Sequence, residues 1–511
     1  MTYDVESLKA GVPSLETEPA DQYEERGTEK LEKDSDLATT AKPSDEESND
    51  DDEWKRDPDN PRNWTSLKKW TAVVIVAGYC FITPLSSSMM APGLEQIRET
   101  YNIANPTIVA LTLSIYLISF AFGPLILSPL SEMYGRTWIL HISNLFTTAF
   151  NLGCAFAPDT GTLLALRFIA GFWGSAPVAI GGGSIADVFD EDNRASAMAL
   201  FSLGPLFGPA IGPAAGGFIA QDLGMKWVFI IIAIVSGVAS LIGIPFLKET
   251  YAPVIRLQKA KRSANPEAET ARVIASLGGP TGTKAQIIWI NLSRPIALLF
   301  GNFVCFILSS YMALNYGIYF LMFATFPKLF REAYGFRPGV GGLAYLGIGF
   351  GFIVATFVGA KFLDGMYRLQ VRKNGGMGTP EMRMPVMFIA SLIVPVGLLW
   401  YGWSAHVKLH WMMPIAGTFI YGFGLMAAYL PIQLYLVDAF TYAASATGAA
   451  SVFRSLLGFV FPLFGQQLTD ALGLGPANTL LAGVAILIGV PFPIWIYFKG
   501  AAMRERSNLS R

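Results

Sequence analysis

The chain has 511 residues, of which 52% are hydrophobic and only 15% are charged, and its mean hydropathy is +0.43. This balance excludes an ordinary water-soluble protein and predicts an all-α polytopic membrane protein that spans the lipid bilayer. The formal net charge of −1 gives no support to a nucleic-acid partner.

The first 53 residues differ from the rest of the chain. They hold about 18 acidic residues and show no hydrophobic periodicity, so they cannot bury enough surface to offset the entropy of ordering. We expect a disordered acidic cytosolic tail over residues 1–53. No signal-peptide pattern precedes the first apolar run, which is therefore expected to direct membrane insertion itself.

About twelve apolar runs follow, each near the roughly 20 residues that a helix needs to cross a bilayer. They are predicted at residues 70–92, 107–128, 137–157, 163–187, 196–220, 226–247, 296–325, 340–363, 384–403, 411–432, 443–467 and 478–499. A long polar and basic stretch separates the sixth run from the seventh. The chain therefore divides into an N-terminal six-helix half (54–247), a central cytoplasmic loop (248–295), a C-terminal six-helix half (296–499) and a cytosolic tail (500–511).

Loop charges predict the orientation of these spans. About 21 Lys and Arg residues fall on the side that carries both termini, and about six fall on the other side. Both termini are therefore expected to be cytoplasmic.

The connection between the second and third runs reads GPLILSPLSEMYGRTWIL, residues 123–140. It contains Glu132, Gly135 and Arg136 close to the predicted helix ends. A carboxylate and an arginine placed there can hydrogen-bond across helices and to a helix terminus, which would latch one conformation. The alternative is ordinary loop charge.

The fourth run contains Arg167, and Asp187 lies near its inner end. A cation inside the apolar slab is costly, so its presence indicates a functional role. The alternative for Arg167 is a side chain that reaches the interface from a helix end, and Asp187 can also be a simple interfacial residue.

The fifth run reads LFGPAIGPAAGGFI over residues 206–219. Gly208, Gly212 and Gly216 recur every four residues, so they remove all side chains from one face of a helix and let a neighbour approach closely. Pro209 and Pro213 are expected to bend the helix. Gly217 extends the face without side chains. The alternative to a pivot is a plain packing face.

Together these stretches resemble the fungal twelve-spanner drug:proton antiporters of the major facilitator superfamily. GPAIGPAAGG (208–217) matches the family's gxxxGPxxGG pattern, PLSEMYGR (129–136) is similar to its loop motif, and the segment around Arg167 resembles lxxxRxxqG with Ala170 in place of Gln. The similarity extends over about residues 54 to 506. It implies the major facilitator fold, a role for Arg167 in proton coupling and export of multidrug or toxin-like compounds.

Transporters of this kind place the substrate near the midplane between their halves. The aromatic, amide and cationic candidates for this site are Tyr79, Phe172, Trp173, Tyr311, Asn315, Tyr319, Tyr421, Tyr429 and Arg454. No carboxylate is expected at mid-depth in spans 1, 4, 7 and 10, which favours neutral or weakly charged amphipathic substrates over polyamines. Candidate proton carriers are Glu132, Asp187 and Asp438.

We find no phosphate-binding GxxxxGK[ST] motif, no nucleophile–base pair and no spacing of Cys or His that suggests a metal site. These absences argue against ATP hydrolysis and against an enzyme. The family resemblance implies a transporter of the plasma membrane that is driven by a proton gradient without a cofactor, and we expect a monomer. The alternatives are a proton-coupled uptake symporter, a polyamine exporter and a non-transporting sensor of the same fold.

Overall fold

A computed structural model describes residues 54–190, 194–276, 284–440 and 443–505. The chain separates into two units, Met1–Asp57 and Pro58–Arg511. The predicted acidic tail at 1–53 and the last six residues, 506–511, lie outside the described residues. Every element in the described part of the second unit is a helix.

In the described residues, the N-terminal half contains eight α-helices and two short 3-10 helices. Its elements are η1 (Pro61–Asn63), α3 (Ser66–Ser88), η2 (Ala91–Gly93), α4 (Leu94–Thr100), α5 (Pro106–Tyr134), α6 (Arg136–Ala155), α7 (Thr160–Gly174), α8 (Ala176–Val188), α9 (Arg194–Asp222) and α10 (Met225–Phe246). Helix α7 begins after Asp159, whose carboxylate accepts hydrogen bonds from the N–H and hydroxyl of Thr162. These bonds lower the pKa of Asp159, as expected for a helix N-cap.

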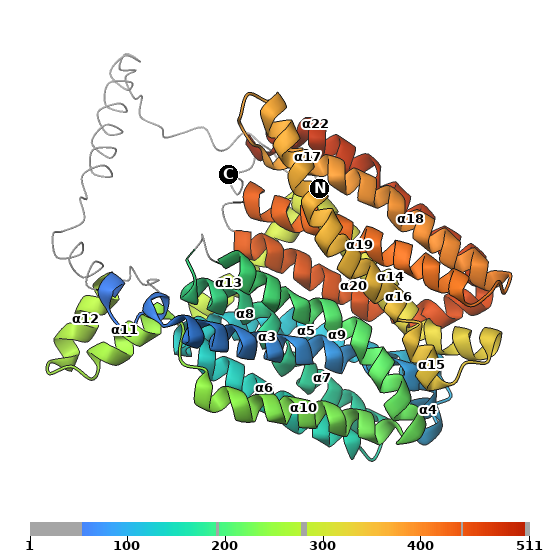
Figure 1. The fold of residues 1–511 in the computed structure, drawn as a ribbon, viewed down its shortest axis with the longest axis horizontal. Helices are drawn as coiled ribbons and strands as arrows, with labels where there is room; N and C mark the ends of the chain where they lie inside the picture. The colour runs from blue at the N-terminus through green and yellow to red at the C-terminus, as the bar shows by residue number, and fades with distance from the viewer. Residues whose placement is uncertain (1–53, 191–193, 277–283, 441–442, 506–511) are drawn as a thin grey trace, which may run out of the picture. The chain divides into compact units, whose positions relative to one another are not determined.

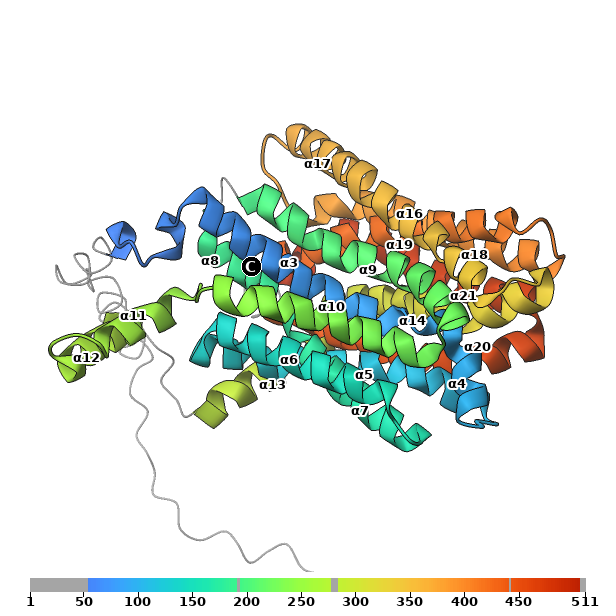
Figure 2. The same ribbon diagram turned by 60° about the horizontal axis from the view of Figure 1, so that its bottom comes forward.

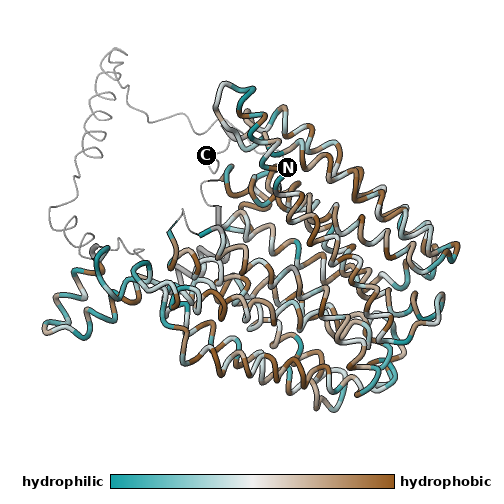
Figure 3. Tube along the Cα trace, in the orientation of Figure 1, coloured by the Kyte–Doolittle hydropathy of each residue, from teal (hydrophilic) through white to brown (hydrophobic). Residues whose placement is uncertain are grey.

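The segment predicted as a central loop contains helices. They are α11 (Ala252–Ala260), α12 (Pro266–Ser276) and α13 (Lys284–Gly301), and α14 (Phe303–Tyr334) follows after Asn302. Figure 3 shows mostly hydrophilic residues along α11 and α12, in contrast with the hydrophobic bundle helices.

The C-terminal half begins at α14. Its elements are α14 (Phe303–Tyr334), α15 (Pro338–Leu343), α16 (Leu346–Val354), the π-helical turn η3 (Ala355–Gly359), α17 (Ala360–Lys373), η4 (Pro380–Arg383), α18 (Met384–His406), α19 (Met412–Ala439), α20 (Ala443–Leu472), α21 (Leu474–Gly489) and α22 (Pro491–Glu505).

Eleven helical segments in the described residues are long and apolar enough to cross a membrane. The predicted third span, 137–157, corresponds to α6, which is long but less apolar and is not among these eleven segments. Its buried Asn144 donates hydrogen bonds to the Ser236 carbonyl (2.9 Å) and the Ser240 hydroxyl (2.6 Å) of α10. These internal bonds satisfy polar groups that hydropathy alone counts against a span.

The predicted seventh span, 296–325, differs most from the structure. The helix breaks at Asn302, whose side chain accepts from the Cys305 N–H (3.1 Å) and caps α14, so the span itself runs over Phe303–Tyr334. The apolar residues before Asn302 belong to α13.

The bundle has two ends that matter for function. The C-terminal ends of α5, α8, α17 and α19 lie at one end of the bundle. We call this end the inner end, because the loop charges predict that it faces the cytoplasm. The outer end carries α4 and α15, which lie on the right in Figure 1, whereas α11 and α12 lie on the left. Figure 2 shows α9 alongside α3 of its own half and α16 of the other half, in agreement with their contacts.

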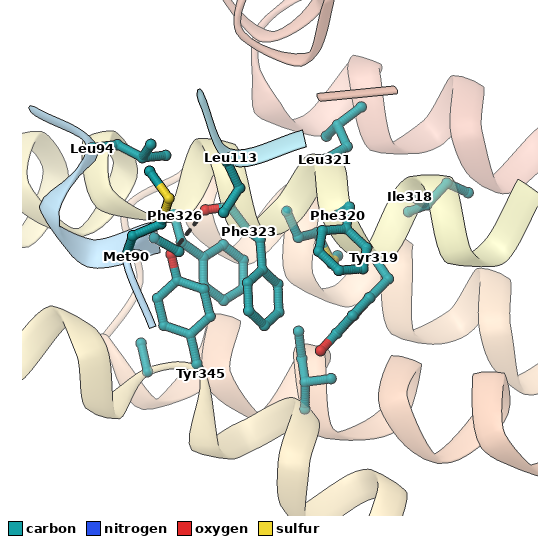
Figure 4. Close-up of a cluster of buried hydrophobic side chains, with 14 of the residues drawn as sticks. Met90, Leu94, Leu113, Ile318, Tyr319, Phe320, Leu321, Phe323, Phe326 and Tyr345 are labelled. Atoms are coloured by element: carbon teal, nitrogen blue, oxygen red, sulfur yellow. Dashed lines mark hydrogen bonds between the residues drawn. The ribbon is translucent and has the colours of Figure 1, made fainter. Parts of the chain in front are cut away.

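The two halves pack tightly at the outer end. Met90, Leu94 and Leu113 of the N-terminal half share one buried hydrophobic cluster with aromatic residues of the C-terminal half, shown in Figure 4. We call these residues the outer plug: Met90, Leu94, Leu113, Phe323, Phe326 and Tyr345. The Tyr345 hydroxyl donates to the Phe323 carbonyl at 2.9 Å, which fixes the ring in place.

Polar contacts between the halves surround the outer plug. The Arg331 guanidinium lies 3.5 Å from the Glu95 carboxylate, and the Gly339 N–H donates to the Gln221 side chain at 3.2 Å. The outer end is therefore closed in this structure.

Candidate functional site

A cavity of about 440 Å³ lies between the two halves. Helices α5 and α8 line one side, and α13, α19 and α20 line the other. Its polar and charged lining residues are Ser128, Glu132, Ser175, Tyr429, Gln433, Ser445, Thr447, Ser451, Arg454 and Ser455. The remaining lining residues are apolar or glycine, so the cavity is amphipathic.

The cavity extends inward from the inner end. Glu132 lies in the last turn of α5 and Ser445 lies at the start of α20. Phe120 precedes Glu132 by 12 residues, which corresponds to about 18 Å along a helix. The cavity therefore has a mouth near Glu132 and a deep part near Phe120 and Arg454.

Arg454 is the cation of the deep part. Its Nη1 donates to the Tyr429 hydroxyl at 3.0 Å, and its guanidinium carbon lies 4.9 Å from the centre of the Tyr316 ring. The amide of Gln433 in turn donates to the Tyr429 hydroxyl at 3.2 Å. These side chains join α14, α19 and α20 in one polar and aromatic wall.

Arg167 is fully buried within the N-terminal half. It donates to the carbonyl oxygens of Ser86 (2.9 Å) and Thr112 (3.4 Å), and its guanidinium carbon lies 4.7 Å from the centre of the Tyr116 ring. Its Nη2 has no hydrogen-bond partner in the part of the chain that the structure describes. The alternative of a side chain that reaches the interface does not hold, because Arg167 is 0% exposed.

A network at the inner end joins α6 and α8 to the segment after α10. The Nε of Arg136 donates to the Asp187 carboxylate at 2.5 Å. The Glu249 carboxylate accepts from the N–H groups of Arg136 (2.9 Å) and Thr137 (3.1 Å), and so caps the N-terminus of α6. Gly135 has φ +105°, and a Cβ there would meet the Glu249 carboxylate.

The predicted latch therefore has a different acidic partner. Glu132 is exposed toward the cavity and forms no ion pair within the described residues, whereas Asp187 pairs with Arg136. The reason is helix phase, because Glu132 lies on the cavity side of the last turn of α5. Sequence reasoning gave no role to Glu249.

The glycine face of α9 packs against α3. A Cβ at Gly204 or Gly208 would come within 3.0 Å of α3 atoms, at the Phe81 backbone and the Pro84 ring respectively. At Gly212 and Gly216 it would meet Ser88 and the Met89 carbonyl. The close approach predicted for this helix is therefore present.

The other faces of α9 meet the C-terminal half. A Cβ at Gly217 would meet the Pro338 carbonyl of α15, and one at Gly342 would meet the Pro213 carbonyl. Pro209 and Pro213 lie within the continuous helix. The stretch at 208–217 therefore lies between α3 and the opposite half at the outer end.

Four of the predicted substrate residues lie together. A small cavity of about 20 Å³ next to the central one is lined by Tyr311, Asn315, Tyr429 and Arg454, among others. The Tyr421 hydroxyl donates to the Asn315 carbonyl at 2.6 Å, so Tyr421 supports this group from behind.

The other predicted substrate residues do not line the central cavity. Tyr79 binds His141 through its hydroxyl (3.1 Å), and Phe172 contacts Trp173 edge to face. Trp173 stacks on Phe146, which is exposed on the bundle surface. Tyr319 lies in the aromatic cluster that also contains the outer plug. Hydropathy places a residue in a span but does not specify which side of the helix faces the cavity.

Sequence reasoning missed most of the lining of the central cavity, including Gln433 and Phe120, and it missed Tyr316 in the small cavity beside it. A glutamine within a hydrophobic span, one turn after Tyr429, was the available signal. No group of three or more His, Cys, Asp or Glu residues suited to a metal occurs in the described part of the chain.

Comparisons with known proteins identify the family. Residues 76–462 match the sequence profile of the Major Facilitator Superfamily. The chain is 42% identical over 452 residues to the MFS transporter prlG of a fungal species, covering 88% of this chain and 95% of the relative. It is 38% identical to the efflux pump vrtL of Penicillium aethiopicum, with 89% and 90% of the two chains covered. The chain therefore belongs to the Major Facilitator Superfamily of transporters, as its motifs predicted.

A solved structure confirms the fold. A partially occluded inward-open conformation of the xylose transporter XylE from E. coli matches with a TM-score of 0.63 and 12% sequence identity. The match covers 85% of this chain and 98% of that chain. The predicted all-α major facilitator fold is therefore confirmed.

Proposed function

We propose that this protein exports amphipathic small molecules from the cytoplasm, coupled to inward proton movement, by alternating access. The observation that carries the proposal is the central cavity, which both halves line and which extends from the inner end while the outer plug closes the opposite end. This arrangement offers the site to the side predicted to be cytoplasmic. Relatives named as efflux pumps and the family pattern at 208–217 support the outward direction.

The cavity lining supports an amphipathic substrate. Phe120, Leu125 and Tyr429 supply apolar and aromatic surface, and several hydroxyl groups supply hydrogen-bonding partners. The polyamine alternative is disfavoured because the deep part holds the cation Arg454, which would repel a polycation.

Glu132 is the proton carrier that the geometry favours. Of the three candidate carboxylates, Asp187 is paired with Arg136 and Asp438 is paired with Arg383 at 2.8 Å. Glu132 lines the cavity and lacks an ion-pair partner within the described residues. A carboxylate in this position can exchange a proton with water that enters the cavity.

The test is the accumulation of fluorescent amphipathic compounds, with a polyamine for comparison, in intact cells that express the protein. We expect cells that express the protein to accumulate less of the aromatic compounds than control cells. A protonophore, Glu132→Gln or Arg167→Ala should each abolish this reduction. Glu267→Gln is the matched control, because Glu267 is exposed on α12. Increased accumulation would instead identify an uptake symporter. Export of the polyamine alone would identify a polyamine exporter.

We further propose a monomer in the plasma membrane with both termini in the cytoplasm; the loop charges support this orientation of the termini. Epitope tags at each terminus test this orientation. Both tags should be accessible to antibody only after permeabilisation, whereas staining of intact cells would contradict it.

A further inference from the structure

The deep part of the central cavity holds a cation without a counter-ion. Within the described residues, the Nε of Arg454 has no hydrogen-bond partner, and Nη1 reaches only the neutral Tyr429 hydroxyl. No carboxylate lies within ion-pair distance of Arg454 among the described residues. A half-buried guanidinium in this state gains from any anion that can reach it.

The nearest acidic candidate in the cavity does not supply that anion. Glu132 is the other charged residue among the described lining residues, and it is exposed at the mouth. Arg454 lies nine residues beyond Ser445 on α20, which places it about 14 Å further from the inner end along that helix. The two charges of the cavity are therefore separated, with the carboxylate of Glu132 at its mouth and the guanidinium of Arg454 in its deep part.

Aromatic rings define the space around the cation. The guanidinium carbon lies 4.9 Å from the ring centre of Tyr316 and 5.6 Å from that of Tyr429. Both rings hold the planar guanidinium in place, which pre-organises its donors for a planar acceptor. Phe120 on α5 adds apolar surface from the opposite half.

We propose that Arg454 and Tyr429 form an acid-binding subsite, and that the transported compound is an amphipathic aromatic molecule with one carboxylate or similarly acidic oxygen. A carboxylate fits the forked guanidinium through two charge-assisted hydrogen bonds. A phosphate dianion would need a second cation, and the described lining offers none. This inference rests on the proposed function, because it takes the central cavity as the substrate site.

The experiment uses three compounds of nearly equal shape and different charge: 1-naphthylacetate, 1-naphthylacetamide and 1-naphthylmethylamine. Their affinities are measured by titration calorimetry on the purified full chain in detergent. We expect the wild type to bind the acid at least about tenfold more tightly than the amide, which equals ~1.4 kcal/mol. The amine is expected to bind more weakly than the amide.

The variants separate recognition from structural support. Arg454→Gln should reduce acid binding to the level of the amide and leave amide binding unchanged, and Arg454→Lys should retain part of the preference. Arg368→Gln, an exposed cation on α17, is the matched control and should behave as the wild type. Equal binding of acid and amide by the wild type, or equal losses for both in Arg454→Gln, would overturn the proposal.

Transport of the acid in proteoliposomes is measured separately. Inward movement, or movement that ignores the proton gradient, would overturn the proposed export and leave the acid-binding subsite intact. If the protein exports neutral compounds but shows no preference for the acid, the acid-binding subsite is overturned and the proposed export stands.

Discussion

Two arginines of the N-terminal half occupy contrasting environments. Arg136 pairs with Asp187 near the inner end, and both side chains are less than one-fifth exposed. Arg167 is fully buried and is solvated only by backbone carbonyl oxygens and aromatic rings. An unpaired buried cation costs free energy, so a role in transport explains the presence of Arg167 better than a role in stability.

This contrast gives a prediction about stability and activity together. Arg136→Met leaves the largely buried Asp187 carboxylate without its ion-pair partner, and should destabilise the fold by about 3 kcal/mol. Arg167→Met removes a desolvated charge at similar volume, and should abolish transport without lowering the melting temperature. Thermal unfolding in detergent and transport assays check both; a large stability loss in Arg167→Met would show that the cation is a structural centre.

Helix α9 shows how a pattern of small residues becomes a specific contact. Its glycine face lets the backbone of α3 approach so closely that no side chain fits at Gly216. The same helix also contacts α15 and α16 of the opposite half. It therefore forms the joint between the N-terminal core and the outer closure.

The prediction at this scale compares two glycines. Gly216→Ala places a methyl group against the Met89 carbonyl, and backbone cannot move aside cheaply, so we expect a loss of about 1–3 kcal/mol and impaired transport. Gly78→Ala on α3 meets nothing within 4 Å and should leave transport unchanged. Comparable effects of the two substitutions would mean that the glycine face tolerates side chains.

Most span positions could be predicted because bilayer thickness sets the length of an apolar run. The break at Asn302 could not, because a single capping amide decides where α14 starts. Arg136 pairs with Asp187 and not with Glu132 because of the phase of helix α5. Tyr79 and Trp173 lie outside the cavity because of the rotation of their helices about their own axes. Tertiary packing determines helix phase and helix rotation, and neither can be predicted from hydropathy.

At the scale of the whole helix bundle, the described residues from Pro58 onward are closed at the outer end and enclose a cavity toward the inner end. The Thr107 hydroxyl and the Gln467 amide lie 2.6 Å apart, from the first turn of α5 and the last turns of α20. Together with Glu95 and Arg331 they join the halves around the outer plug. Alternating access requires these contacts to separate once in each cycle.

Cross-linking the outer end should therefore stop transport. In Thr107→Cys with Gln467→Cys, a short bifunctional thiol reagent should abolish transport almost completely, and a reductant that cleaves the linker should restore it. Cys80, Cys154 and Cys305 are buried and free, so they should contribute little background. Each single variant treated alike is the control; normal transport by the cross-linked protein would mean that the outer end need not open.

The outer plug also makes the conformational equilibrium sensitive to temperature. Separation of the halves exposes aromatic and aliphatic surface from Met90, Leu94 and Phe326, all buried here. Hydration of that surface raises the heat capacity of the open form, and the hydrophobic penalty falls on cooling. The population with an open outer end should thus increase in the cold, and an Eyring plot of the transport cycle should be curved.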